Sequence, residues 1–365
     1  MTTTVPITVT LTVDGVAVPA PGIAQIPDQV PPPTAAAVAS ALAATPSFVS
    51  AVAAALGTPP PPPPPPTGGF QVKAGKLYDP NGVQFIPRGV DRDHYDSSAS
   101  TAGIARAGAN VVRFGEYLDT LIGNYIPVLK AHIASKVVPI VAMFYFPDGS
   151  LTVGGQDPAE IALAATWWAT NAATFRAALG KNWMINLANE WGPRGSTVWR
   201  DAMIAAIKTM RAAGITEVIW CDTGGFGQDL SDLTLYSTAV FNSDPLKNTA
   251  FSLHVYNSYN DLPTLNAALA QLNALSASIG MVFGVLEFGP GPGVGVSSQL
   301  TATQVIGACE AAGIPWCAWA WDDSSPGFGM TTNPDGTYNV ASDLTPYGTA
   351  IVAQLKALAK PATSV

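Results

Sequence analysis

The chain has 365 residues, of which 48% are hydrophobic and only 12% are charged, and its formal net charge is −8. This length allows one large domain with a sizeable core plus an appendage. Because the charge balance is acidic and no run of Lys or Arg occurs, nucleic acid and membranes are not expected partners, whereas a neutral polymer is compatible with this surface.

The first 57 residues are predicted to form a separate module. The alternating stretch ITVTLTVDGVAV predicts a strand or hairpin, and an Ala-rich stretch interrupted by Pro46 predicts two short helices. This module is too small to build much core, so we expect it to mediate oligomerisation or attachment to a larger assembly, such as a cell surface or virus particle. The eight consecutive prolines Pro59–Pro66 predict a semi-rigid linker over residues 58–67.

Targeting and metal-binding signals are sparse. The N-terminal MTTTVPITVTLTV lacks the basic and continuous apolar regions of a signal peptide, and no stretch predicts a transmembrane helix. The three cysteines, Cys221, Cys309 and Cys317, do not suggest a disulfide framework, and no Cys/His cluster has metal-ligand spacing. We therefore expect neither a metal nor an organic cofactor.

Strand-like and helix-like segments alternate strictly from residue 68 to residue 358. The predicted strands are 84–90, 110–114, 137–145, 183–189, 216–222, 250–256, 281–287 and 314–321. The predicted helices are 99–108, 117–135, 158–179, 196–213, 228–240, 262–279, 298–312 and 343–358. The strands are near-continuous apolar runs, as in parallel sheets buried on both faces. This pattern predicts an α/β fold, a (β/α)8 TIM barrel, as one domain over residues 68–365. A doubly wound open sheet is the alternative, but no Gly-rich phosphate loop follows the first strand.

Two of the apolar runs end in a glutamate: WMINLANE closes on Glu190 and MVFGVLE closes on Glu287. In a barrel of this type, the chemistry lies at the C-terminal ends of the strands. Two carboxyl groups held about 5–5.5 Å apart can act as acid/base and nucleophile on a glycosidic bond. Asn189 can add a hydrogen bond to a sugar 2-hydroxyl. A glutamate at one strand end is often only a solvated loop residue, but two such motifs on one rim favour catalysis.

Other polar and aromatic residues are predicted on the same rim. Arg113 can keep Glu287 ionised, and Tyr256 can donate its hydroxyl to that carboxylate. His254 can position the other glutamate, and Trp319 can form the floor beneath a sugar. Each also has a structural reading, as an ion pair or as core. The remaining candidates for substrate binding or support are His94, Trp191, Asp222 and Trp321.

Several stretches are individually distinctive. They are GFQVKAGKLYDPNGVQFIPRGV, AGANVVRF, INLANEW, RAAGITEVIWCDTGGFGQ, VFNSDPLKNTAFSLHVY, GVLEFG and WCAWAW. On these residues the chain, from Gly69 to about Tyr347, resembles glycoside hydrolase family 5, and within it the bacterial endo-β-1,4-mannanases. The resemblance implies a retaining hydrolase of β-1,4-linked mannan or glucomannan, with Glu190 as acid/base and Glu287 as nucleophile. It also implies that His94 lines the non-reducing side, and a polysaccharide substrate implies an extracellular or surface-associated location.

The chain departs from those mannanases in the residues around the catalytic pair. Phe144-Tyr145 stand where they have a histidine–aspartate pair, and Phe226 stands where they have a tryptophan. Asp91, Arg92 and Asp96 replace first-strand residues. Two alternatives therefore remain: an endo-β-1,4-glucanase of the same family, or a catalytically weak carbohydrate-binding barrel.

Overall fold

The computed structural model of the protein describes residues 2–13, 16–27, 68–92, 99–117, 122–145, 149–323, 325–333 and 342–358. The chain divides into two compact units, residues 1–65 and 66–365. In the first unit, β1 (Thr2–Val13) and β2 (Val16–Pro27) pair in antiparallel fashion, which is the hairpin that the alternating residues predict. The helices predicted between residues 34 and 56, the proline linker and His94 lie outside the described residues.

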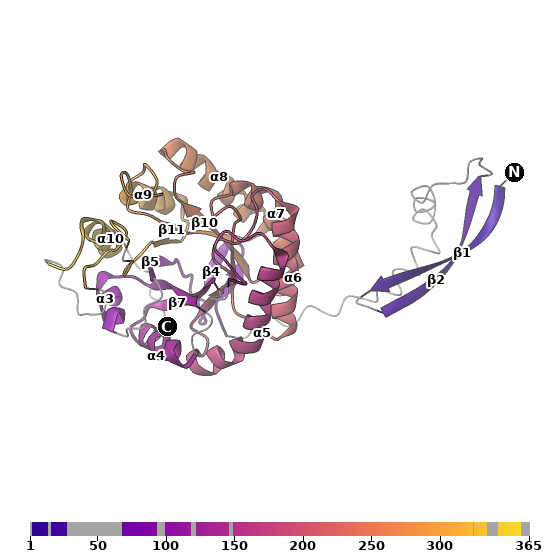
Figure 1. The fold of residues 1–365 in the computed structure, drawn as a ribbon, viewed down its shortest axis with the longest axis horizontal. Coiled ribbons are helices and arrows are strands. Elements are labelled where there is room, and N and C mark those ends of the chain that lie inside the picture. The colour runs from indigo at the N-terminus through magenta and orange to yellow at the C-terminus, as the bar shows by residue number, and fades with distance from the viewer. Residues whose placement is uncertain are drawn as a thin grey trace. The chain divides into compact units, whose positions relative to one another are not determined.

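The second unit contains a closed barrel of eight parallel strands surrounded by helices (Figure 1). The strands are β5 (Arg88–Arg92), β6 (Val111–Tyr117), β7 (Val138–Tyr145), β8 (Met184–Asn186), β9 (Ile219–Asp222), β10 (Thr249–Val255), β11 (Val282–Phe288) and β12 (Trp316–Ala318). Their order around the barrel is β5 to β12, with β12 pairing back to β5. The predicted (β/α)8 barrel is confirmed, and the open sheet is excluded.

One described helix follows each strand. They are α3 (Ala99–Ala107), α4 (Ile122–Ala134), α5 (Pro158–Leu179), α6 (Thr197–Ala212), α7 (Leu230–Ser243), α8 (Leu262–Ile279), α9 (Ala302–Ala312) and α10 (Pro346–Ala357). Capping side chains fix several starts: Asp157, Ser196 and Asp261 each accept a backbone N–H at a helix N-terminus, and Thr301 forms a capping box with Gln304. Among the described helices, none combines the length and apolar character needed to cross a bilayer.

The barrel interior is packed with apolar side chains rather than open. Trp220 of β9 is fully buried there, in a cluster with Val111, Ile140 and Leu286. Gly284 on β11 makes room for this indole, because a Cβ at that position would come within 3.0 Å of the Trp220 ring. The packed interior holds the strand ends, and the side chains they carry, in fixed positions.

A short hairpin that the sequence reasoning missed packs against the N-terminal ends of β10 and β11. It consists of β3 (Gln71–Lys73) and β4 (Lys76–Tyr78). The Asn248 side chain, just before β10, donates to the Phe70 carbonyl at 3.1 Å. The first barrel strand was predicted to begin at residue 84, but it begins at Arg88. Pro87 explains the difference, since it has no N–H to donate to a sheet ladder.

His132 of α4 is a buried histidine without a hydrogen bond. Its ring lies 6.4 Å from the Phe114 ring, is fully buried, and has no hydrogen-bond partner at either nitrogen among the described residues. Burial, together with the positive charge of Arg92, lowers the pKa of His132 to about 3. The imidazole is therefore neutral in the folded protein at any pH near neutrality.

This arrangement predicts acid-sensitive stability. The unfolded chain binds a proton at His132 near its ordinary pKa of 6.5, whereas the folded chain does not until about 3, so stability falls as the pH drops through this interval. At about pH 4.5 the loss due to His132 is about 2–3 kcal/mol. Urea unfolding of wild type and His132→Leu at about pH 7.5 and pH 4.5 measures it. The variant should lose less stability on acidification, and an equal loss in both proteins would contradict the assignment.

Candidate active site

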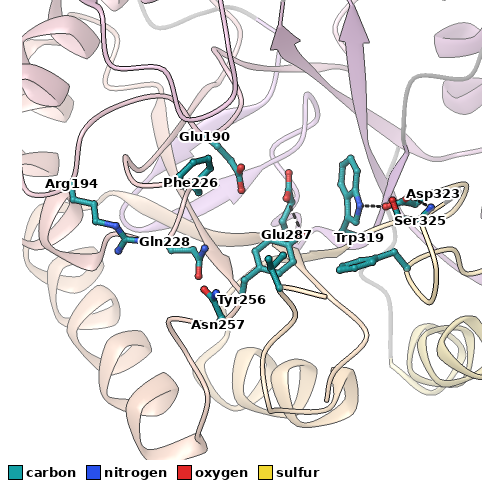
Figure 2. A pocket seen from close by; sticks show the side chains of 12 residues that line it. Glu190, Arg194, Phe226, Gln228, Tyr256, Asn257, Glu287, Trp319, Asp323 and Ser325 are labelled. Carbon is teal, nitrogen blue, oxygen red and sulfur yellow. Dashed lines mark hydrogen bonds between the residues drawn. The ribbon is translucent and has the colours of Figure 1, made fainter. Parts of the chain in front are cut away.

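A cavity of about 540 Å³ opens at the C-terminal ends of the barrel strands. Figure 2 shows Glu190 and Glu287 facing each other in its middle. The residues that line it are Glu190, Arg194, Phe226, Gln228, Tyr256, Asn257, Glu287, Val296, Trp319, Asp323, Ser325 and Phe328. The two glutamates identified from strand ends thus lie in one cavity although they are far apart in the sequence.

Glu190 lies on a tight turn after β8. The strand was predicted over residues 183–189 but ends at Asn186, and Glu190 has a left-handed backbone with φ of 54°. Such a conformation is strained for a non-glycine residue and needs support. Its N–H donates to Asp222 Oδ2 at 3.2 Å, and its carbonyl accepts from Gly154 N–H at 3.2 Å. These bonds to neighbouring elements hold the carboxylate at the cavity.

Glu287 is held by two donors at the end of β11. Arg113 Nη1 donates to Oε1 at 2.6 Å, and the Tyr256 hydroxyl donates to Oε2 at 3.0 Å. A register shift between β10 and β11 aligns His254 with Glu287, a re-aiming that β-bulges often provide near active sites. Burial raises the pKa of Glu287 above its ordinary value, and the charges of His254 and Arg113 oppose that rise.

Arg113 is the centre of the hydrogen-bond network. Besides Glu287, it donates to Asn186 at 2.8 Å, to Asn189 at 2.5 Å and to Asp222 and Asp91 at 3.2 Å each. Burial alone would lower the pKa of this guanidinium, but the surrounding carboxylates outweigh it and raise the pKa. Arg113 is therefore a permanent cation, fully buried, that connects the ends of β5, β8, β9 and β11.

His254 lies between the two glutamates. Its Nδ1 is 2.7 Å from Glu190 Oε1 and 3.4 Å from Glu287 Oε2, and its Nε2 is 3.5 Å from Asp222 Oδ2. Burial would lower the pKa of His254, but Glu287 and Asp222 raise it to about 10. One ligand-type atom each of Glu190, His254 and Glu287 lies within 4.8 Å of the others.

Trp319 forms one wall of the cavity. Its indole N–H donates to Asp323 Oδ2 at 2.6 Å, and its ring stacks on Phe144 with centroids 5.5 Å apart. The Arg113 guanidinium also lies over the Phe144 ring, 5.2 Å from its centroid. Phe144 therefore supports both the wall and the central cation.

Two tryptophans expected to bind or support the substrate do not reach the cavity. Trp191 and Trp321 are both essentially fully buried, and the Trp191 indole donates to Glu160 at 2.7 Å. The left-handed backbone at Glu190 turns the chain, so the residue after it packs outside the barrel. Trp191 and Trp321 therefore contribute to the packing around the barrel rather than to the cavity lining. Asp222 also does not line the cavity, but it accepts from both Arg113 and the Glu190 N–H.

The sequence reasoning gave no role to several residues that the structure places in or behind the site. Asn186 accepts from Arg113 and donates to Asp222 at 3.0 Å. A lone amide in an apolar barrel strand was the signal that could have identified it. Arg194 and Gln228 lie on loops after strands, where residue spacing carries little information.

Two of the altered first-strand residues, Asp91 and Arg92, are buried ionisable side chains, and Asp96 lies outside the described residues. Asp91 is fully buried, and burial raises its pKa well above the ordinary value despite the opposing charge of Arg113. Arg92 forms a fully buried ion pair with Asp322 at 2.9 Å and lies 5.3 Å from the Phe114 ring centroid. This pair connects the end of β5 with the segment that follows β12, three residues beyond Trp319.

Comparison with known proteins gives a consistent result. Residues 79–325 match the cellulase family, glycosyl hydrolase family 5. The chain is 32% identical over 270 residues to a mannan endo-1,4-β-mannosidase of Salipaludibacillus agaradhaerens, covering 70% of this chain and 82% of that protein. It is 29% identical over 272 residues to the Streptomyces lividans enzyme of the same name, covering 71% and 68%. The fold matches a Thermomonospora fusca β-mannanase in complex with mannotriose, with a TM-score of 0.69, 24% identity and coverage of 81% and 98%.

The network around Arg113 predicts a large stability effect. Arg113→Gln leaves the buried Asp222 and Glu287 without their shared cation and Asp91 without a hydrogen-bond donor, so we expect a loss of about 3–5 kcal/mol in the free energy of unfolding. Arg200→Gln is the control, because Arg200 makes a partly exposed ion pair with Asp201 on α6 and a contact with the Tyr236 ring, and its loss should change stability little. Denaturant unfolding of the three proteins at neutral pH provides the comparison. Similar stability of all three would show that the buried network does not depend on Arg113.

Proposed function

The chain belongs to glycosyl hydrolase family 5, and on that premise we propose that it is a retaining endo-β-1,4-glycanase that cleaves β-mannan or glucomannan. The observation that carries this proposal is the close approach of Glu190 and Glu287 in one cavity. Oxygen atoms of the two carboxylates lie within 4.8 Å of each other. This spacing supports a retaining mechanism, since inverting enzymes leave about 6.5–9.5 Å between the carboxyl groups to admit water.

In the first step, Glu287 attacks the anomeric carbon while Glu190 donates a proton to the leaving oxygen. The bond between that carbon and the leaving oxygen breaks, and a glycosyl ester forms on Glu287. Arg113 and Tyr256 donate to the two Glu287 oxygens, so they orient the nucleophile and favour its ionised form. In the second step, Glu190 takes a proton from water, which attacks the same carbon and releases the sugar.

The surrounding residues divide the supporting tasks. Asn189 uses its carbonyl oxygen to accept from Arg113, so its amide NH₂ can donate to the 2-hydroxyl of the reacting sugar. His254 holds the Glu190 carboxylate through Nδ1. Trp319 presents an aromatic face on which the apolar face of a sugar ring can stack.

The relatives favour mannan as the substrate. The S. agaradhaerens and S. lividans relatives are mannan endo-1,4-β-mannosidases, and the T. fusca β-mannanase binds mannotriose. The second candidate is an endo-β-1,4-glucanase, which the family description as cellulase supports. Phe226 and Phe144 also leave this possibility open, because both depart from the pattern that the resemblance to the mannanases implies.

The roles of the two glutamates predict different losses. Glu287→Gln should reduce kcat to below about 0.1% of wild type on every substrate, because an amide cannot form the glycosyl ester. Glu190→Ala should slow polysaccharide cleavage strongly but affect aryl glycosides with good leaving groups less, since these need no protonation in the first step.

Glu217→Gln is the matched control. Glu217 lies just before β9, at the opposite end of the barrel from the cavity, and pairs with Arg176 of α5. It should retain normal activity. Near-normal turnover by Glu287→Gln would refute the assignment of the nucleophile.

Substrate preference can be measured directly. Mannose and glucose differ in the orientation of the 2-hydroxyl, and mismatched hydrogen bonds around one buried hydroxyl can produce large discrimination. We expect higher kcat/KM on pure β-1,4-mannan and glucomannan than on a neutral soluble cellulose derivative. A preference for the cellulose derivative would assign the protein to the endoglucanases, with the mechanism unchanged.

A further inference from the structure

The cavity has an uneven distribution of charge. Three of the charged residues that line it, Glu190, Glu287 and Asp323, are acidic, and Arg194 is the only cation among the described lining residues. Arg194 lies at the Glu190 side, whereas Asp323 lies beside Trp319 at the other side (Figure 2). Among the described residues that line the cavity, positive charge is therefore confined to one end, whereas Arg113 and His254 lie behind the two glutamates.

Arg194 is held in place without being neutralised. Its Nη2 donates to the Gly225 carbonyl at 3.0 Å, and its side chain lies against Gly225, where a Cβ would come within 2.3 Å of Arg194 Cγ. Gly225 has a φ of 61°, so both the backbone conformation and the missing side chain suit this contact. Arg194 is exposed, and within the described part of the chain it has no carboxylate partner. Its remaining N–H donors are available to a ligand.

The neighbours of Arg194 form a surface suited to a sugar. Phe226 is 54% exposed, and its ring lies against Gly154, whose N–H donates to the Glu190 carbonyl. An exposed aromatic face at this point can stack on a sugar ring. Gln228 uses its carbonyl oxygen to accept from Ser258 N–H at 3.0 Å, which leaves its NH₂ free to donate.

Resting on the function proposed above, we propose that Arg194 is a specificity-determining residue that binds a carboxylate on the sugar in the leaving-group part of the cavity. Glu190 protonates the leaving oxygen, so the leaving sugars lie on its side, where Arg194 is. A guanidinium matches a carboxylate with two parallel hydrogen bonds, which a neutral hydroxyl cannot form. At the Trp319 side, Asp323 and Glu287 would repel an acidic sugar. The substrate class is thus a β-1,4-glycan in which some units carry a carboxylate.

The test compares two forms of one substrate: β-1,4-mannan and the same mannan partly oxidised at C6 to carboxylate. Arg194→Gln should lower kcat/KM on the oxidised form by about 10-fold or more, the effect of losing a hydrogen bond to a charged group. On neutral mannan the loss should be below about 3-fold. Arg194→Lys should retain part of the activity on the oxidised form, since it keeps the charge but not the planar donor pair. Arg200→Gln, which removes an arginine of α6 outside the cavity lining, should match wild type on both.

Two further readouts separate recognition from a structural effect. In the wild type, about 0.5 M NaCl should reduce cleavage of the oxidised form selectively, because salt screens an exposed ion pair, and Arg194→Gln should lose this salt dependence. Mass spectrometry of the products should place oxidised sugars preferentially at new non-reducing ends, the position that the leaving sugar acquires. Equal losses on both substrates in Arg194→Gln, or a random placement of oxidised sugars, would overturn the proposal.

Failure of the proposed function would be recognised separately. If the wild type cleaves neither mannan nor glucan, the glycanase assignment is wrong. Calorimetric binding of oxidised and neutral manno-oligosaccharides to wild type and Arg194→Gln then decides the role of Arg194 alone. Tighter binding of the oxidised form that is lost in the variant supports it, and equal binding overturns it.

Discussion

The site depends on placing three acidic side chains around one buried arginine and a fourth beside a buried histidine. Asp91, Asp222 and Glu287 all contact Arg113, and Glu190 joins them through His254. Burying carboxylates without partners would cost several kcal/mol each, so this cluster is tolerable only because the cations are built into the same barrel. The barrel makes that possible: parallel strands bring the ends of β5, β6, β9 and β11 to one rim, although these segments are distant in the sequence.

The same charges give the two glutamates different surroundings, which support the different roles proposed for them. Glu287 has two fixed donors, Arg113 and Tyr256, which orient it for the proposed nucleophilic role; burial raises its pKa, and the charge of Arg113 opposes that rise. Glu190 contacts only His254 through its carboxylate among the described residues, and its backbone is held in a strained conformation by Asp222 and Gly154. With fewer fixed donors, this carboxyl group is free to contact both a leaving oxygen and a water, as the proposed acid/base role requires. Different surroundings thus support the different roles proposed for two chemically identical side chains.

Sequence patterns predicted the barrel, its eight helices and both glutamates, because continuous apolar runs and strand-end carboxylates are local signals. They did not predict the β3–β4 hairpin, whose short strands depend on contacts with residues near 248 and 280. They placed Trp191 and Trp321 near the substrate, because no local signal reveals the turn at Glu190 that directs Trp191 outward. Asn186 and Arg194 were missed for a related reason: their importance lies in partners far along the chain, Arg113 and Gly225.

The proposed mechanism requires that Glu287 form a covalent glycosyl ester while Glu190 acts as acid/base. Incubation with a 2-deoxy-2-fluoro manno-oligosaccharide fluoride tests it most directly, because the fluorine at C2 slows both steps and fluoride leaves without protonation, so the ester accumulates. Mass spectrometry of the digested protein should find one glycosyl unit on the peptide that contains Glu287 and on no other. A label on a different residue, or steady turnover of the reagent without any covalent species, would contradict the account.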